Sequence, residues 1–129
     1  MEIKPSQALP QCVGNLSQEV ISRLGLHYGS GPIYIGPSNV EHIRCKHPVE
    51  FVKHLQDIPD IIENPDYIAV HPRQGGVEFV RMFEENGVMV SVRPSAKGTL
   101  FVRSIYAVTD ERVQSYLQKG TLIRFEEEC

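Results

Sequence analysis

The sequence contains no tryptophan and few cysteines. Its three cysteines, Cys12, Cys45 and Cys129, are widely spaced and form no CxxC pair. A small disulfide-bonded domain carries a denser and even set, so we expect free thiols and a cytoplasmic protein. Because tryptophan is absent, the five phenylalanines and five tyrosines must supply the aromatic part of the core.

A long hydrophobic run is absent as well. A membrane-spanning helix needs about 20 consecutive apolar residues, and every apolar stretch here is much shorter. The first residues, MEIKP, do not resemble the apolar segment of a signal peptide. We therefore expect no membrane association.

Of the 129 residues, 41% are hydrophobic and 22% are charged, and this length and composition are typical of one globular domain.

Acidic residues are absent from residues 86–109, although the net charge of the whole chain is −3. This stretch does contain three cations, Arg93, Lys97 and Arg103. Five of the 16 acidic residues follow Thr109, three of them at the very end. An acidic protein can thus present a local cationic face. The total charge does not exclude a nucleic-acid partner; it predicts local and modest binding.

The order of periodic segments predicts an α+β fold with helices before the sheet. Residues 1–14 show no period and are interpreted as an arm, followed by a single domain over residues 15–129. Helical spacing is found at 16–24, 38–47, 49–55, 58–62 and 110–119. Short β-prone or alternating segments predict strands at 33–35, 67–70, 88–93, 100–108 and 122–125, with a hairpin turn at residues 86–87. Residues 77–84 fit neither pattern.

Local signals place the ends of the middle helices. Ser38, with Glu41 three residues later, predicts a capping box at the start of the 38–47 helix. Pro48 fits the first turn of the helix that follows. That helix is expected to bury Phe51, Val52 and Leu55, as its apolar positions.

The densest polar cluster is the run His-Ile-Arg-Cys-Lys-His at residues 42–47. On a helix, His42 and Lys46 share a face, whereas His47 projects from another side. Imidazole acts as an acid or base near neutral pH, and a neighbouring cation stabilises an anionic group. The combination suits phosphodiester chemistry, in which one group removes a hydroxyl proton and another protonates the leaving oxygen.

Two other interpretations of this run remain open. It can be a solvent-exposed helical face with histidines near its end. It can also be a metal site built from His42, Cys45 and His47, joined by His54 or His71. The i, i+3, i+5 spacing does not bring three ligands to one face, and no CxxC or HExxH motif is present. We therefore expect no metal and no other cofactor.

The sheet half of the sequence carries a second polar group. Alternation places Ser91 with Arg93 on one side of their strand, and Ser104 with Tyr106 on one side of the next. The same alternation places Arg103 on the opposite side from Ser104. These side chains can form a platform for a phosphate backbone. Alternatively, Tyr106 faces the core and the arginines face solvent.

The order of these motifs resembles a known family. The sequence has IYI at residues 33–35, HIxxKH at 42–47 and IPxIIxxPDYI at 58–68, then the SxY of Ser104 and Tyr106. In this order it resembles the phage-associated nucleases of the barnase–EndoU–colicin–RelE-like superfamily. The resemblance spans roughly residues 32–124, and its most specific part is HIxxKH with the downstream IPxII and PDYI.

The resemblance implies a compact α+β ribonuclease fold with helices packed on a four- to five-stranded antiparallel sheet. It also implies metal-independent cleavage of RNA, in which the ribose 2′-hydroxyl attacks the adjacent phosphate and leaves a 2′,3′-cyclic phosphate. Such domains serve as toxins or phage effectors. RNA, such as tRNA, is then the expected partner, together with a protein inhibitor. A catalytically inactive nuclease-like binding module is the alternative, and a metal-dependent enzyme is a third hypothesis.

The resemblance also assigns roles to residues. A histidine, His47 in preference to His42, acts as the base or acid, and a second such group is not identified. Lys46 and Arg93 stabilise charge, and Ser104 or Tyr106 orients the phosphate or relays a proton. The expected catalytic set is thus His42, Lys46, His47, Arg93, Ser104 and Tyr106. The expected RNA-binding residues are Arg44, Lys97 and Arg103.

Overall fold

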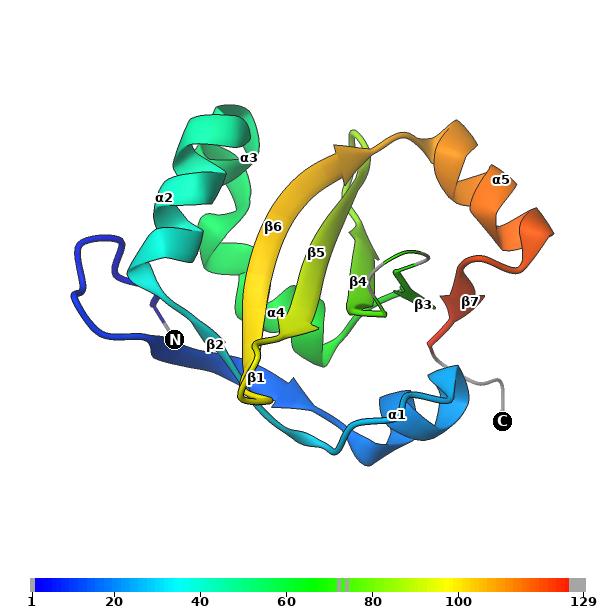
Figure 1. Ribbon diagram of the computed structural model, residues 1–129. Coiled ribbons are helices and arrows are strands. Elements are labelled where there is room, and N and C mark those ends of the chain that lie inside the picture. The colour runs from blue at the N-terminus through cyan, green and yellow to red at the C-terminus, as the bar shows by residue number, and fades with distance from the viewer. Residues whose placement is uncertain (1, 72, 74, 126–129) are drawn as a thin grey trace.

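A central sheet of seven strands organises the computed structural model, which describes residues 2–71, 73 and 75–125. The strands follow the order β1-β2-β6-β5-β4-β3-β7, and the helices surround them (Figure 1). The strands are β1 (Gln11–Leu16), β2 (Gly31–Ile35), β3 (Tyr67–Val70), β4 (Val77–Met82), β5 (Gly87–Pro94), β6 (Leu100–Val108) and β7 (Ile123–Arg124). The helices are α1 (Gln18–Leu24), α2 (Pro37–Lys46), α3 (Pro48–His54), the 3-10 turn η1 (Leu55–Asp57), α4 (Ile58–Glu63) and α5 (Asp110–Lys119). The α+β class is as predicted.

The sheet differs from the predicted one in size and in direction. The prediction of four to five antiparallel strands was wrong, because the described residues form seven and one pair is parallel. In that pair, β2 and β6 meet only at Ile33 with Leu100 and at Tyr34 with Phe101. Strands that pair in parallel need a long connection between them. Such a pairing between distant segments leaves no local pattern in the sequence.

The first 14 residues also differ from the expected arm. Residues 11–14 belong to β1, which pairs antiparallel with β2 at the edge of the sheet. Further upstream, Ile3 is fully buried. The side chain of Gln56 accepts a hydrogen bond from the Ile3 N–H and donates one to the Ile3 carbonyl, both at 2.8 Å. This segment therefore packs as part of the domain.

Helix α2 begins earlier than predicted. Ser38 is not its N-cap; Gly36 is, and Pro37 occupies the first turn. Proline fits this position because its fixed φ is already helical. The Asn39 side chain accepts a hydrogen bond of 2.7 Å from the Gly36 N–H. Ser38 consequently lies inside the first turn of the helix, where it is free to face the sheet.

The core occupies both faces of the sheet unequally. The larger cluster contains the β5 residues Val88, Val90 and Val92 together with apolar residues of α1, α2 and α4. A smaller cluster on the other face joins the β5 residue Met89 to Val113 of α5. Figure 1 shows α5 at one end of the sheet and α2 with α3 at the other.

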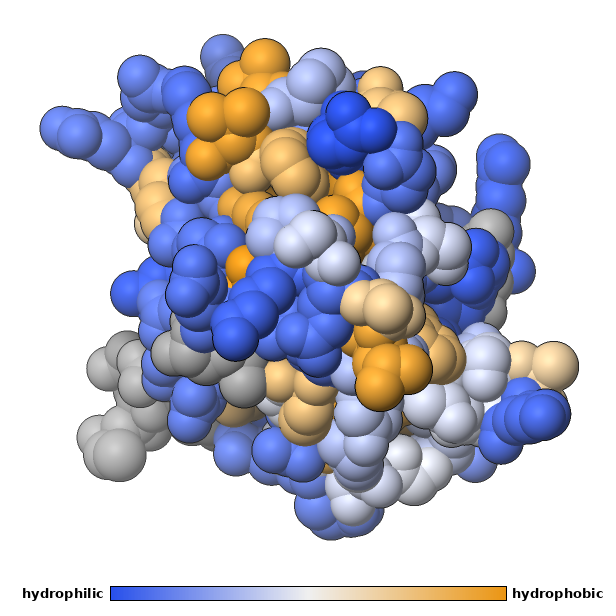
Figure 2. All heavy atoms as spheres, turned by 90° about the vertical axis from the view of Figure 1, so that its left-hand side faces the viewer, coloured by the Kyte–Doolittle hydropathy of each residue, from blue (hydrophilic) through white to orange (hydrophobic). Residues whose placement is uncertain are grey.

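Helix α3 exposes an apolar side chain that was expected to be buried. Leu55 is buried and Phe51 is partly buried, but the side of α3 that carries Val52 faces solvent, leaving that residue 81% exposed. The prediction for Val52 was therefore wrong, because only one side of this short helix packs on the domain. Figure 2 views this side of the molecule and shows apolar side chains near its upper end.

A β-bulge in the β5–β6 pair decides which side chains face the cleft. Ser91 pairs with Ser104, but the next pair joins Val92 to Val102, so Arg103 has no partner across the strands. An extra residue of this kind interrupts the alternation of side chains. Arg103 and Ser104 consequently line the same cleft. The predicted alternation, with these neighbours on opposite sides, was wrong at this point.

Candidate active site

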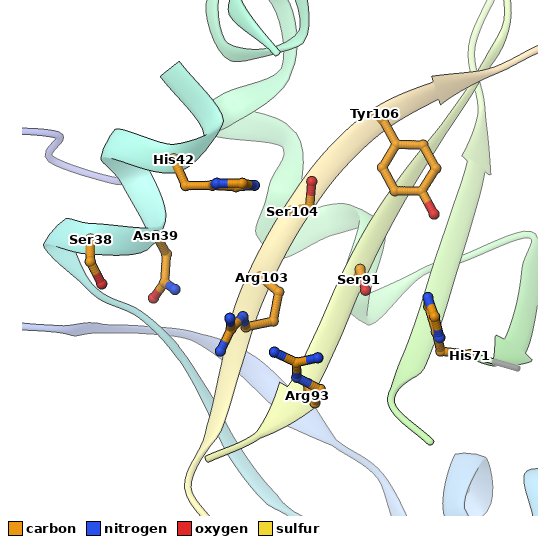
Figure 3. Close-up of a pocket in the computed structure, with 9 residues that line it drawn as sticks. All are labelled: Ser38, Asn39, His42, His71, Ser91, Arg93, Arg103, Ser104 and Tyr106. Atoms are coloured by element: carbon orange, nitrogen blue, oxygen red, sulfur yellow. The ribbon is translucent and has the colours of Figure 1, made fainter. Parts of the chain in front are cut away.

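A cleft of about 440 Å³ lies on the face of the sheet that α5 covers only in part. Its lining comes from α2, the end of β3, β5 and β6 (Figure 3). The lining residues are Ser38, Asn39, His42, His71, Ser91, Arg93, Arg103, Ser104 and Tyr106. All nine are polar or charged, so the cleft suits a polar ligand.

Helix α2 forms one wall of the cleft. Ser38 and His42 are four residues apart and therefore lie on the same side of the helix. The helix fits beside β6 because β2 pairs with only the first two residues of that strand. Figure 3 shows the His42 ring extending from α2 over the strands. The short β2–β6 contact thus leaves space for a histidine at the side of the sheet.

His71 forms the opposite wall, at the end of β3. The backbone N–H of His71 donates to the Gly76 carbonyl at 2.7 Å, and the backbone N–H of Gly75 donates to the His71 carbonyl at 3.1 Å. The Arg73 N–H donates to His71 Nδ1 at 3.2 Å. In the neutral ring Nε2 then carries the proton. The Tyr28 hydroxyl donates to the Gly75 carbonyl at 2.9 Å and so holds the segment between β3 and β4 in which His71 lies.

The floor between the two histidines is cationic. Arg93 of β5 is half-buried and Arg103 of β6 is exposed. Neither guanidinium makes a hydrogen bond or an ion pair within the described part of the chain. Ser91 and Ser104, which pair across the two strands, place hydroxyl groups beside them. Guanidinium groups bind phosphate oxygens in pairs, and hydroxyls add further donors.

Tyr106 is linked to a buried carboxylate. Its hydroxyl donates a hydrogen bond of 3.1 Å to Glu78 of β4, which is only 7% exposed. Burial raises the pKa of Glu78, while the Tyr106 hydrogen bond and the charge of His71 act in the opposite direction. Burial also raises the pKa of Tyr106, and the negative charge of Glu78 adds to this effect. Tyr106 therefore keeps its proton and acts as a donor, not as a base.

The structure brings five of the predicted site residues to the cleft: His42, Arg93, Arg103, Ser104 and Tyr106. His47 does not line the cleft, but its ring centroid lies 6.2 Å from that of His42 and 6.0 Å from that of Tyr106. Their catalytic and RNA-binding roles stay predictions.

Like His47, three further predicted residues lie outside the cleft lining. Arg44 forms an ion pair with Glu41 on the exposed side of α2. The hydrogen bond from Arg44 lowers the pKa of the Glu41 carboxyl. Lys46 is exposed at the end of α2, and Lys97 is exposed in the turn between β5 and β6. None of these three cations lines the cleft, and their RNA-binding roles stay predictions.

The sequence patterns did not single out His71 and Glu78 for the catalytic site. His71 was considered only as a metal ligand. Glu78 was missed because residues 77–84 match neither the helical nor the strand pattern. A usable signal was present, since Glu78 is the only acidic residue within the apolar run from Val77 to Val80. A carboxylate surrounded by core residues has a raised pKa and often a function.

The described residues contain no group of three His, Cys, Asp or Glu side chains that could hold a metal ion. Of the histidines considered as ligands, His54 is engaged elsewhere. Its Nδ1 lies 2.9 Å from an Asp57 carboxylate oxygen, and its ring packs on Phe83.

Among the residues that the structure describes, no helix is long and apolar enough to cross a membrane.

Comparison with known proteins gives one match. The family model described as phage-Barnase-EndoU-ColicinE5/D-RelE like nuclease3 matches residues 11–115. The chain belongs to this nuclease family. All nine residues that line the cleft lie within the matched segment of the family model. Neither the curated proteins nor the solved structures contain a match to the chain. Membership of a phage-associated nuclease family agrees with the resemblance found in the sequence and supports nuclease activity.

Proposed function

We propose that this nuclease is a metal-independent endoribonuclease. The observation that carries the proposal is the arrangement of the cleft, in which His42 and His71 stand on opposite walls of a floor with two arginines. Imidazole pairs provide an acid and a base near neutral pH. Arginines provide the charge stabilisation that a phosphodiester needs.

Each step of the reaction uses groups that the chain supplies. His42 accepts the proton of the ribose 2′-hydroxyl as the 2′-oxygen forms a bond to phosphorus. The bond from phosphorus to the 5′-oxygen breaks, and that oxygen leaves with a proton from Nε2 of the protonated His71 ring. In this protonated form Nδ1 no longer accepts the hydrogen bond from the Arg73 N–H. The products are a 2′,3′-cyclic phosphate and a 5′-hydroxyl.

The remaining cleft residues hold the phosphate. Arg93 and Arg103 neutralise the charge that develops on its oxygens, and the hydroxyl of Ser104 donates to it. The proton of the Tyr106 hydroxyl is engaged by Glu78. Tyr106 is therefore assigned to positioning the wall of the cleft, and not to relaying a proton.

This assignment changes the roles expected from the sequence. His42 takes the acid–base role expected of His47, because His42 lines the cleft. His47 supports it through ring contacts with His42 and Tyr106. Lys46 and Arg44, which lie on the same helix, are assigned to phosphates of the RNA outside the cleft, together with Lys97.

A comparison of RNA with DNA of the same sequence, both in the presence of EDTA, tests the proposal. We expect cleavage of RNA alone, with 2′,3′-cyclic phosphate ends. A single 2′-deoxy substitution at the cleavage site should abolish cleavage there. Loss of activity in EDTA, cleavage of DNA or 5′-phosphate ends would contradict the mechanism. RNA binding without cleavage would favour the inactive binding module.

In a cell, this activity makes the protein a toxin or phage effector that acts on RNA such as tRNA. Expression of the active chain should then arrest growth, and a cognate protein inhibitor should relieve the arrest. Expression of His42→Ala, at the same protein level, should not slow growth. Growth arrest that persists in this variant would contradict a toxin role based on catalysis.

A further inference from the structure

A second hollow adjoins the cleft. It has a volume of about 230 Å³ and shares two lining residues with the cleft, His71 and Tyr106. Its other lining residues are Ala69, Glu78, Met89, Ala107, Val108, Arg112, Tyr116, Thr121 and Leu122. Because His71 and Tyr106 border both spaces, a ligand with its phosphate in the cleft can extend an attached group into the second hollow.

The walls of this hollow differ from those of the cleft. They include Met89 and Val108 of the sheet and Leu122 beyond α5, all from the smaller core cluster. The Tyr116 ring is partly buried beside them. Such walls suit a flat apolar group. Of the parts of a nucleotide, the base has this character, and bases pack on aromatic and apolar side chains in many RNA-binding proteins.

Two polar groups in the hollow face the same space. Glu78 lines the hollow and not the cleft. One of its carboxylate oxygens accepts the Tyr106 hydrogen bond, and the other has no donor among the described residues. Arg112 also lines the hollow, and its guanidinium has no partner within the same residues. The hollow thus contains one hydrogen-bond acceptor and one donor between apolar walls. A nucleobase carries both donors and acceptors on its edge and can bind to both groups.

We propose that this hollow binds a nucleobase of the RNA next to the cleaved phosphate. The exocyclic amino group of adenine, cytosine or guanine donates to Glu78, and Arg112 donates to an acceptor on the base. Uracil has no amino group and is disfavoured. This inference rests on the proposed ribonuclease function. The family match ends at residue 115, so Tyr116, Thr121 and Leu122 lie outside it.

Binding of nucleoside 3′-monophosphates tests the proposal without any cleavage. Titration calorimetry with the adenosine, cytidine, guanosine and uridine compounds should show at least one amino-bearing base binding 10-fold or more tighter than uridine. Inorganic phosphate serves as the reference for the cleft alone. Equal affinity of all four compounds, at the level of inorganic phosphate, would overturn the inference.

Variants locate the preference in the hollow. Thr121 is exposed at its edge, so Thr121→Trp should fill the hollow and reduce the affinity of every nucleotide to that of inorganic phosphate. Arg112→Ala should weaken nucleotide binding several-fold and leave phosphate binding unchanged. Gln114→Ala, at an exposed position of α5 outside the hollow, is the matched control and should behave as the wild type. A base preference that survives Thr121→Trp in a folded protein would place it elsewhere and overturn the inference.

The two proposals fail in different ways. If RNA is cleaved but the wild type binds all four nucleotides equally, the base site is wrong and the ribonuclease function stands. If nucleotides bind with the expected preference but RNA remains intact, the hollow binds a base and the catalytic proposal is wrong.

Discussion

Glu78 and Tyr106 show how burial selects the chemical state of a residue. The carboxylate lies among core residues of β4, and the phenol faces it from β6 at 3.1 Å. Removal from water disfavours the charged form of each group, so the pKa of both is raised. The phenol therefore remains a donor. The sequence patterns singled out His, Arg, Ser and Tyr residues that the structure places at the cleft, whereas Glu78 was missed because no strand was predicted for its segment.

The two cleft histidines should each be needed for catalysis. His42→Ala and His71→Ala are each expected to lower kcat roughly 10²–10⁴-fold, because each removes one proton-transfer group. The substitution His47→Ala should lower kcat less, because His47 does not line the cleft. His27→Ala, an exposed histidine outside the cleft, is the control. Steady-state kinetics on a short RNA measure these rates. A wild-type rate for His71→Ala would remove that residue from the mechanism.

Glu78 should make stability depend on pH. Its pKa is raised in the folded state, so the protonated form stabilises the fold below the unfolded pKa of about 4.3. That contribution is lost as the pH rises through the folded pKa. Glu78→Gln keeps an acceptor for Tyr106 and carries no charge. We expect the variant to melt at a higher temperature than the wild type at pH 7, with a smaller difference near pH 4.

Thermal denaturation followed by circular dichroism between pH 4 and pH 8 measures this difference. Glu84→Gln, at an exposed position after β4, is the matched control and should show no such trend. A Glu78→Gln variant that is less stable than the wild type at pH 7 would mean that the charged form is favoured in the fold.

At the scale of elements, the cleft depends on how strands and loops end. Local signals mark the ends of α1 and α5: Ser17 and Thr109 cap these helices, and Gly25 and Gly120 end them in the left-handed conformation. The bulge at Arg103 and the position of His71 beside the cleft were not predictable. Both depend on how neighbouring strands align, which is decided by packing across the sheet.

The hydroxyl of Tyr28 is expected to position His71 through the loop between β3 and β4. Tyr28→Phe removes the 2.9 Å hydrogen bond to the Gly75 carbonyl. A bond of this kind contributes about 1 kcal/mol, which corresponds to roughly a fivefold change in rate. We expect kcat to fall about fivefold while KM for RNA stays unchanged.

Tyr34→Phe is the control, because the Tyr34 hydroxyl makes no hydrogen bond to the described residues and its ring contacts Phe101. Kinetics of both variants, with melting temperatures to confirm folding, separate positioning from stability. An unchanged kcat in Tyr28→Phe would show that the loop holds His71 without this bond.

At the scale of the whole molecule, charge is segregated along the chain. The net charge is −3, yet residues 86–109 carry cations and no acidic residue, and two of those cations form the floor of the cleft. RNA binding should therefore depend on a few local contacts and not on the total charge.

Salt dependence measures the number of these contacts. For single strands, log affinity falls by about 0.7 per phosphate contact for each tenfold increase in salt. With Arg93 and Arg103 in the cleft and three further cations outside it (Arg44, Lys46 and Lys97), we expect a slope of about −3.5 for RNA binding by a cleavage-deficient protein. Arg103→Ala should reduce it to about −2.8. A slope unaffected by this substitution would show that Arg103 does not contact phosphate.

The sequence by itself determined the α+β class, the helical histidine–cation run and the resemblance to a nuclease family that comparison then showed. These features depend on backbone preferences and spacing within a few residues. Only the tertiary structure decided that His42 and not His47 lines the cleft, and that His71 faces it from β3. It also placed Arg103 beside Ser104. Those outcomes follow from strand pairing and packing between segments far apart in the chain, where no single segment contains the information.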